Sequence, residues 1–81
     1  MGNKKFVLKG REIFSRSGLP NTHQLSLQAR ISAQTAYKYV DKPEDIQAVD
    51  CSILASILLD GVGLSVEEVL NMRVGDLFEL K

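Results

Sequence analysis

The spacing of helix-breaking residues is the feature that most constrains how this chain can fold. Glycines, prolines and capping residues divide the 81 residues into short segments of helical size. Strand signals are scarce, and the sequence has no internal repeat, heptad array or low-complexity stretch. A chain of this length buries a single small core. The sequence therefore predicts one all-α domain over residues 1–81.

The first helical segment is expected over residues 5–17, because apolar residues recur there at helical spacing. Its apolar face would carry Phe6, Val7, Gly10, Ile13 and Phe14. A glycine on a buried face costs helix stability, so Gly10 indicates a close approach to another helix. Gly18 suits a C-terminal cap and Pro20 cannot continue a helix, so the segment ends there.

Two short helices follow, with a tight turn between them. The second helix is expected over about residues 22–30, with Asn21 or Thr22 as its cap. The third is expected over residues 33–40, with Ser32 as its cap. The inward positions of the pair are Leu25, Ser26, Ala29, Ala36, Tyr39 and Val40. Because each helical residue turns by about 100°, the opposite strip of the third helix faces outward. This outer strip consists of Ala33, Gln34, Tyr37 and Lys38.

Two further helices are expected in the second half of the chain. Asp50 caps a fourth helix, which ends at the glycines of residues 61–63. Ser65 and Glu68 have the spacing of a capping box at the start of a fifth helix. The extension over residues 71–81 is either a helical turn or an extended arm. Its apolar residues need burial, in a dimer contact or against the domain's own core: Val74, Leu77, Phe78 and Leu80.

The charges are balanced in total but not along the chain. Ten Lys and Arg residues match ten Asp and Glu residues, and a net charge of zero by itself argues against a nucleic-acid binder. Residues 1–42 hold eight basic and two acidic residues, a net charge of +6, and residues 43–81 hold the reverse, a net charge of −6. We therefore expect a dipolar domain with one half that attracts polyanions.

The sequence carries no signal for catalysis, metal binding or membrane insertion. His23 is the single histidine and cannot make a metal site alone, and there is no Gly-rich phosphate loop and no Ser-His-Asp set. The lone cysteine, Cys51, indicates a reducing compartment and is expected as a small core residue. No apolar run has the length of a membrane span or the pattern of a secretion signal. We expect a cytoplasmic protein that is not an enzyme, with no cofactor, no metal, no membrane contact and no small-molecule ligand.

The segment HQLSLQARISAQTAYKYV resembles the helix-turn-helix of the phage Cro/CI-type repressors, the xenobiotic-response-element (XRE) family. Leu25 matches the first leucine of the family pattern, and Ile31 and Ser32 match its Val-Ser step. The matching residues of the recognition helix are Thr35, Ala36, Lys38 and Tyr39. The segment VDCSILASILLDGVGLSVEEVL also resembles the family, so the similarity covers roughly residues 6–70. It implies a five-helix Cro/CI domain, like that of lambda repressor, with a short C-terminal extension over residues 71–81.

Arg30 departs from the family pattern, which has glycine at this turn position. A residue there is expected in the left-handed backbone conformation, which arginine adopts at some energetic cost. Ser26 also stands where the family usually has alanine.

The resemblance implies sequence-specific binding to double-stranded DNA by a bacterial or phage transcriptional regulator, such as a repressor, that is a homodimer at the nucleoid. The helix-turn-helix spans about residues 22–40, and the recognition helix, about residues 33–40, enters the major groove. Base contacts are expected from its outer strip: Ala33, Gln34, Tyr37 and Lys38. Contacts to the DNA backbone are expected from Asn21, Thr22, His23, Gln24, Thr35 and Lys42. For Tyr37, contact with a protein partner is an equal alternative.

Two other functions fit the same sequence. A helix-turn-helix scaffold that has lost DNA binding would act as a protein-interaction adaptor, with the acidic half docking a partner. The zero net charge and Arg30 in place of glycine favour that alternative. An antitoxin of a toxin-antitoxin module is the third alternative.

Overall fold

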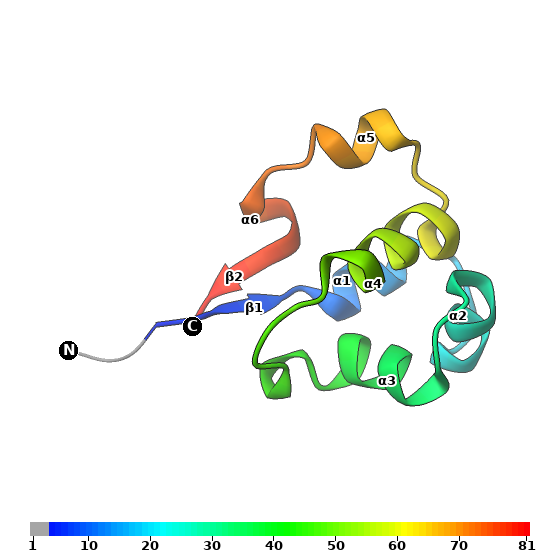
Figure 1. The fold of residues 1–81 in the computed structure, drawn as a ribbon, viewed down its shortest axis with the longest axis horizontal. Coiled ribbons are helices and arrows are strands. Elements are labelled where there is room, and N and C mark those ends of the chain that lie inside the picture. Colours follow the sequence, from blue (N-terminus) through cyan, green and yellow to red (C-terminus); the bar gives the residue numbers. More distant parts are fainter. Residues whose placement is uncertain (1–3) are drawn as a thin grey trace.

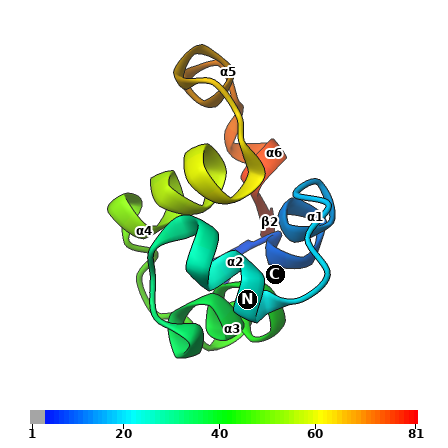
Figure 2. The ribbon, with the colours of Figure 1, turned by 90° about the vertical axis from the view of Figure 1, so that its right-hand side faces the viewer.

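The computed structural model describes residues 4–81. Its elements in chain order are β1 (Phe6–Leu8), α1 (Gly10–Ser15), α2 (Thr22–Ala29), α3 (Ala33–Asp41), η1 (Pro43–Asp45), α4 (Cys51–Ser56), η2 (Ile57–Val62), α5 (Val66–Leu70), α6 (Val74–Leu77) and β2 (Phe78–Leu80). The short element η1 is a 3-10 turn, and η2 continues α4 as a π-helix. Helices α1 to α4 form the body of the domain, the two strands extend from one end of it, and α5 projects from another side (Figure 1, Figure 2). The described chain is therefore mostly helical, with a small sheet.

The core forms where α2 and α3 pack on each other and on η2. Leu25 and Leu58 lie at its centre with fully enclosed side chains, and burial of each contributes about 2 kcal/mol. The other buried members of the cluster are Leu8, Ile13, Ala29, Tyr39, Val40, Leu54 and Ile57. Every inward position predicted for the second and third helices is buried, including Ser26 and Ala36. The hydrophobic pattern of these two helices is thus confirmed.

Two glycines let backbone and side chains approach closely in this core. Gly10, the first residue of α1, lies against the backbone carbonyl of Tyr39, and a Cβ atom there would overlap that oxygen. Gly61, in η2, lies against α2, and a Cβ atom there would come within 2.5 Å of Cδ1 of Leu25. The close helix approach predicted at Gly10 is confirmed. These contacts fix α1 against α3, and η2 against α2.

The expected first helix is wrong over its first residues. Phe6–Leu8 form strand β1, and α1 begins only at Gly10. Val7 and Leu8 are buried, but Phe6 is 62% exposed and does not belong to a buried helix face. Three successive apolar residues suit a strand that is covered on both faces for part of its length. The strand that pairs with them lies more than 70 positions away, between Phe6 and Leu80 for example, so local periodicity could not reveal it.

The C-terminal extension is both a helical turn and a strand, and it folds back on the domain. After the turn of α6, β2 runs antiparallel to β1, with Phe6 opposite Leu80, Val7 opposite Glu79 and Leu8 opposite Phe78. Leu77 and Phe78 pack against the core, whereas Val74 and Leu80 are exposed. The prediction of an all-α domain is wrong in this respect, because the extension completes a two-stranded sheet.

The caps predicted for the later helices are present. The Oδ1 atom of Asp50 accepts hydrogen bonds from the backbone N–H groups of Ser52 (2.8 Å) and Ile53 (3.3 Å) at the start of α4. Ser65 Oγ accepts from the N–H of Glu68 (3.0 Å), and Glu68 Oε1 accepts from the N–H of Ser65 (2.9 Å), which completes the capping box of α5. Both helix starts are therefore where the sequence placed them.

The fourth helix differs from expectation in two details. Its last turns are π-helical and end at Gly63, whose φ of 86° makes it a left-handed cap. Cys51 is exposed at the start of α4, so its predicted place in the core is wrong; the first residue after a cap faces solvent here. Within residues 4–81, no helix combines the length and the apolar character needed to cross a membrane.

Candidate nucleic-acid interface

The turn between α2 and α3 is built around a left-handed residue. Arg30 has φ 59° and ψ 43°, as expected, and among residues 4–81 it is the one non-glycine residue with positive φ. The backbone N–H groups of Arg30 and Ile31 both donate to the carbonyl of Ser26, which closes the end of α2. The chain therefore reverses within three residues, and α3 packs directly against α2 (Figure 2).

Capping side chains fix where the two helices begin. Asn21 Oδ1 accepts a hydrogen bond from the N–H of Gln24 at 2.9 Å. Ser32 Oγ accepts from the N–H of Thr35 at 3.1 Å and donates to the hydroxyl of Thr35 at 2.7 Å. Such caps stabilise a helix by about 1 kcal/mol each. They also hold the first turn of α3 in one register, so that its outward side chains are presented in a fixed order.

The two faces of α3 have the composition that the sequence predicts. Ala36, Tyr39 and Val40 are buried against the body of the domain. The outer strip, Ala33, Gln34, Tyr37 and Lys38, is exposed along its whole length. In the described part of the chain, no hydrogen bond or ion pair engages the side chains of these four residues. The strip is therefore free to contact another molecule.

The residues predicted to contact a DNA backbone lie around this strip with different exposure. Asn21, His23, Gln24 and Lys42 are exposed, whereas Thr22 and Thr35 are half-buried. Four of these residues lie at the N-terminus of α2, where backbone N–H groups favour an anion: Asn21, Thr22, His23 and Gln24. Lys42 lies at the other side of the pair, as the C-cap of α3. The hydroxyl of Thr35 accepts a hydrogen bond from Ser32, which leaves its own O–H free to donate to a phosphate.

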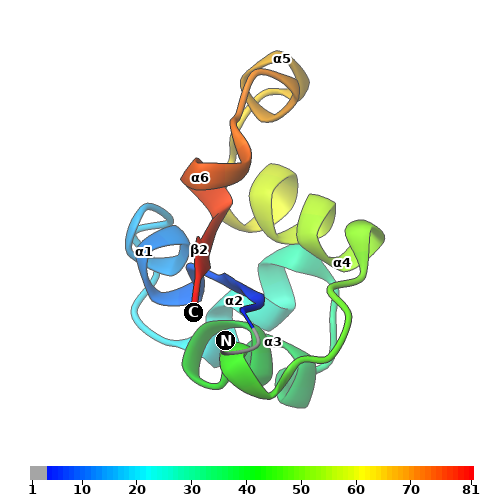
Figure 3. The ribbon, with the colours of Figure 1, turned by 90° about the vertical axis from the view of Figure 1, so that its left-hand side faces the viewer.

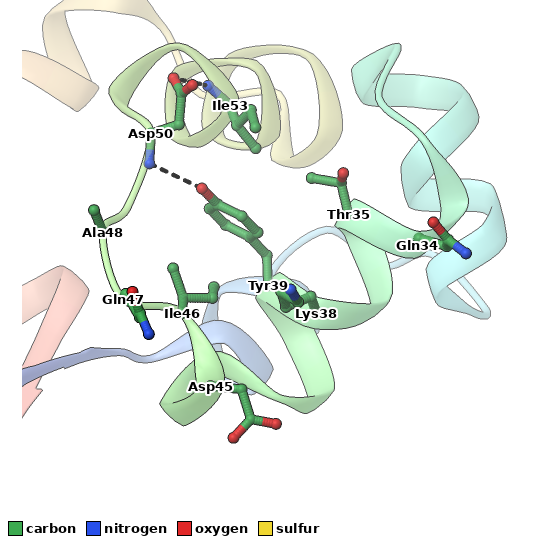
Figure 4. Close-up of a pocket in the computed structure, with 10 residues that line it drawn as sticks. All are labelled: Gln34, Thr35, Lys38, Tyr39, Asp45, Ile46, Gln47, Ala48, Asp50 and Ile53. Carbon is green, nitrogen blue, oxygen red and sulfur yellow. Dashed lines mark hydrogen bonds between the residues drawn. The ribbon is translucent and has the colours of Figure 1, made fainter.

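A shallow groove of about 630 Å³ runs beside the outer strip, between α3 and the segment that leads into α4. Figure 4 shows its walls, with Tyr39 at the centre and its hydroxyl directed at the backbone of Asp50. The α3 wall carries Gln34 and Lys38. The opposite wall is formed by Asp45, Ile46, Gln47, Ala48, Asp50 and Ile53. Sequence reasoning missed residues 45–48 as part of this site, because a wall of this kind has no periodic pattern.

Acidic groups lie closer to α3 than the sequence division at residue 42 suggests. Asp45 and Asp50 line the groove on the side opposite Lys38. The basic half is partly engaged as well, because Arg11 Nη2 forms an ion pair of 2.8 Å with Asp41 at the end of α3. Two carboxylates from the acidic half of the sequence, Asp45 and Asp50, therefore lie beside a helix of the basic half. The cations at this site are Lys38, within α3, and Lys42, the C-cap of α3.

Comparisons with known proteins give no relative for this chain. It matches no protein-family model, no curated protein and no solved structure. The function is therefore argued from the geometry of α2 and α3 and from the chemistry of the side chains that they expose.

Proposed function

We propose that this domain binds double-stranded DNA through α2 and α3, as a transcriptional regulator of the Cro/CI type with that family's helical arrangement. The observation that carries the proposal is the outer strip of α3. Ala33, Gln34, Tyr37 and Lys38 project from a short helix that is packed against α2 across a tight turn, and all four are exposed. A helix held in this way fits the width of the major groove of B-DNA.

The chemistry of the strip suits base recognition. Gln34 carries a donor and an acceptor and would form two hydrogen bonds with the N6 and N7 atoms of adenine. Lys38, one helical turn later, would donate to O6 and N7 of guanine. Ala33 presents a methyl group that can pack on a thymine methyl. Tyr37, which is 49% exposed, would reach a sugar or phosphate beside them.

Contacts with the phosphates would fix the position of α3 in the groove. The N-terminus of α2 offers the side chains of Asn21, His23 and Gln24, and Lys42 offers a cation at the end of α3. These contacts carry no sequence information but supply much of the affinity. Two copies of the domain on half-sites about one helical turn apart would occupy a promoter and control access of the polymerase.

Selection of bound sequences from a random duplex pool tests the proposal, followed by fluorescence anisotropy titrations with the selected duplex. The wild-type domain is expected to bind saturably and with salt-dependent affinity. Gln34→Ala should lose its preference at one base pair, typically a change of about 1–3 kcal/mol. Gln28→Ala is the matched control, because Gln28 is exposed on α2 outside the outer strip. A wild-type domain that binds no duplex at low salt would exclude DNA binding.

The acidic wall of the groove favours a second candidate function, that of a protein-interaction adaptor. Asp45 and Asp50 would weaken the binding of phosphates near Lys38. The groove that they line would instead accept a basic side chain of a partner protein. Chromatography on heparin separates the two candidates. A DNA-binding domain should be retained at low salt and eluted by salt, whereas an adaptor with this surface should pass through the column.

A further inference from the structure

The outer strip of α3 consists of two parallel rows with different chemistry. Residues four positions apart lie on the same side of a helix, one turn after the other. Gln34 and Lys38 form a polar row, and both line the groove beside α3 (Figure 4). Ala33 and Tyr37 form an apolar row, and neither of them lines that groove. The exposed face of α3 therefore has a polar side next to the groove and an apolar side away from it.

The residues that continue the two rows give them different charges. One turn further along, the polar row reaches Lys42, which is exposed, so this row carries two cations. The apolar row reaches Asp41, but Arg11 of α1 forms an ion pair of 2.8 Å with that carboxylate. Helix α1 lies beside this end of α3, with Gly10 against the backbone of Tyr39 (Figure 3). The apolar row therefore presents carbon surface and ends in a neutralised charge.

We infer that the apolar row recognises the 5-methyl group of a pyrimidine in the major groove, a group that thymine and 5-methylcytosine share. The inference rests on the proposed DNA binding and adds the chemical group that Ala33 and Tyr37 select together. A 5-methyl group is the apolar feature of a base edge in the major groove, and alanine and aromatic side chains contact it without hydrogen bonds. The polar row, by contrast, matches the hydrogen-bonding atoms of purines.

Tyr37 supplies most of the carbon surface of the apolar row. Its side chain is 49% exposed and makes no hydrogen bond within residues 4–81. Long side chains of a helix are directed back towards its N-terminus, so the ring of Tyr37 extends towards Ala33, the first residue of α3. A methyl group placed between the ring and the side chain of Ala33 would have apolar contacts on two sides. The hydroxyl at the far end of the ring would still reach a sugar or phosphate.

Fluorescence anisotropy titrations with modified duplexes test this inference. In the first arm, each thymine of the selected duplex is replaced in turn by deoxyuridine, which lacks the methyl group but keeps the O4 acceptor. In the second arm, each cytosine is replaced in turn by 5-methylcytosine. One recognised methyl group should change the affinity about fourfold, as expected for burial of a group of this size.

The two arms distinguish the two sources of the methyl group. A loss of affinity at one position in the first arm assigns thymine as the source. A gain at one position in the second arm, without a loss in the first, assigns 5-methylcytosine and makes the domain a sensor of cytosine methylation. Either result supports the inference.

Three variants connect the methyl effect to the apolar row. Tyr37→Ala removes the ring and should reduce the effect of the methyl group to less than about twofold. Tyr37→Phe keeps the ring and should retain the full effect, because loss of the hydroxyl weakens binding to both duplexes alike. Leu27→Ala is the matched control, since Leu27 is a 61% exposed apolar residue of α2 outside the outer strip. All three substitutions change exposed side chains and should leave the helical circular dichroism unchanged.

Two results would overturn the inference. One is a wild-type domain that binds the selected duplex with the same affinity in both arms, with or without each methyl group. The other is a Tyr37→Ala variant that keeps the full methyl effect, which would assign the effect to the shape of the duplex. A domain that binds no duplex at all contradicts the proposed function itself, whereas saturable binding without a methyl effect contradicts this inference alone.

Discussion

The hydroxyl oxygen of Tyr39 accepts a hydrogen bond of 2.9 Å from the backbone N–H of Asp50. Tyr39 belongs to the buried face of α3, and Asp50 is the residue that caps α4. One side chain thus joins the helix that presents the outer strip to the start of the next helix, across the groove that separates them. This bond holds the two walls of the groove at a fixed distance.

We predict that Tyr39→Phe lowers the free energy of unfolding by about 1–2 kcal/mol, because the N–H of Asp50 loses its partner while the ring still fills the core. Urea denaturation followed by circular dichroism measures the change. Tyr37→Phe is the control, since its exposed hydroxyl makes no hydrogen bond within residues 4–81, and it should leave the midpoint in place. Equal stability of both variants would show that the bond to Asp50 contributes nothing.

Gly10→Ala should destabilise the domain by about 3 kcal/mol, which is at the upper end of overpacking effects. The new methyl group would overlap the backbone carbonyl of Tyr39, and a backbone group inside a helix cannot move aside as a flexible side chain can. Thermal unfolding is expected to show a clear fall in the midpoint. Gly75→Ala provides the comparison within the same chain. Gly75 lies in α6 with open space around it and should tolerate alanine without loss. Equal midpoints of the two variants would show that the contact with Tyr39 does not restrict residue 10.

Arg30→Gly is expected to stabilise the fold by about 0.5–1 kcal/mol. Glycine removes the steric cost of the left-handed conformation, which exceeds the extra backbone entropy that glycine loses on folding. Arg30→Ala should give no such gain, because alanine keeps the Cβ atom. Chemical denaturation of the three chains compares them directly, and a stabilised alanine variant would point to removal of charge rather than relief of strain.

The capping box of α5 should make stability depend on pH. The hydrogen bond from the backbone N–H of Ser65 holds the pKa of Glu68 below its usual value of 4.5. A carboxyl group whose pKa is lower in the folded state stabilises the fold above the unfolded pKa, and this contribution is lost as the pH falls through the folded pKa. When the pH is lowered from about 6 to about 3, the free energy of unfolding of Glu68→Gln should therefore fall less than that of the wild type.

Denaturation at a series of pH values checks this, with Glu67→Gln as the control. Glu67 lies in the same helical turn but takes no part in the capping box. If the glutamine variant at residue 68 follows the pH profile of the wild type, the capping box does not couple to stability.

Lys42→Ala should weaken binding of every duplex to a similar extent and should lower the slope of log affinity against log salt by about 1, the value for one lost phosphate contact. Arg73→Ala removes the same charge at the start of α6, away from α2 and α3. It should leave the slope unchanged. Identical effects of the two substitutions would assign the salt dependence to net charge rather than to contact with a phosphate.

The parts of the fold that could be predicted are those with local chemical signals. Ser32 and Asp50 cap their helices as expected because an N-cap is defined within three residues of sequence. The two faces of α3 follow from helical periodicity alone. The conformation of Arg30 was predictable only through the resemblance to the Cro/CI family, since nothing in arginine itself favours a left-handed backbone.

The parts that could not be predicted depend on contacts between distant segments. Local periodicity places Phe6 in a helix, whereas its strand partner Leu80 lies at the other end of the chain. The groove wall at Asp45 and Gln47 is positioned by packing of a loop with no periodic pattern. Sequence reasoning therefore located the outer strip of the candidate site but not the acidic surface that faces it.

The pairing of β1 with β2 has a consequence for the order of folding. Phe6 and Leu80 are separated by 74 positions, so their contact requires closure of almost the entire described chain. The contacts of α2 with α3 span far shorter loops and can form before that closure. We therefore expect the helical body to assemble first and the sheet to close afterwards. In native-state hydrogen exchange, the amides of Val7 and Glu79 should then exchange earlier than those of the core helices.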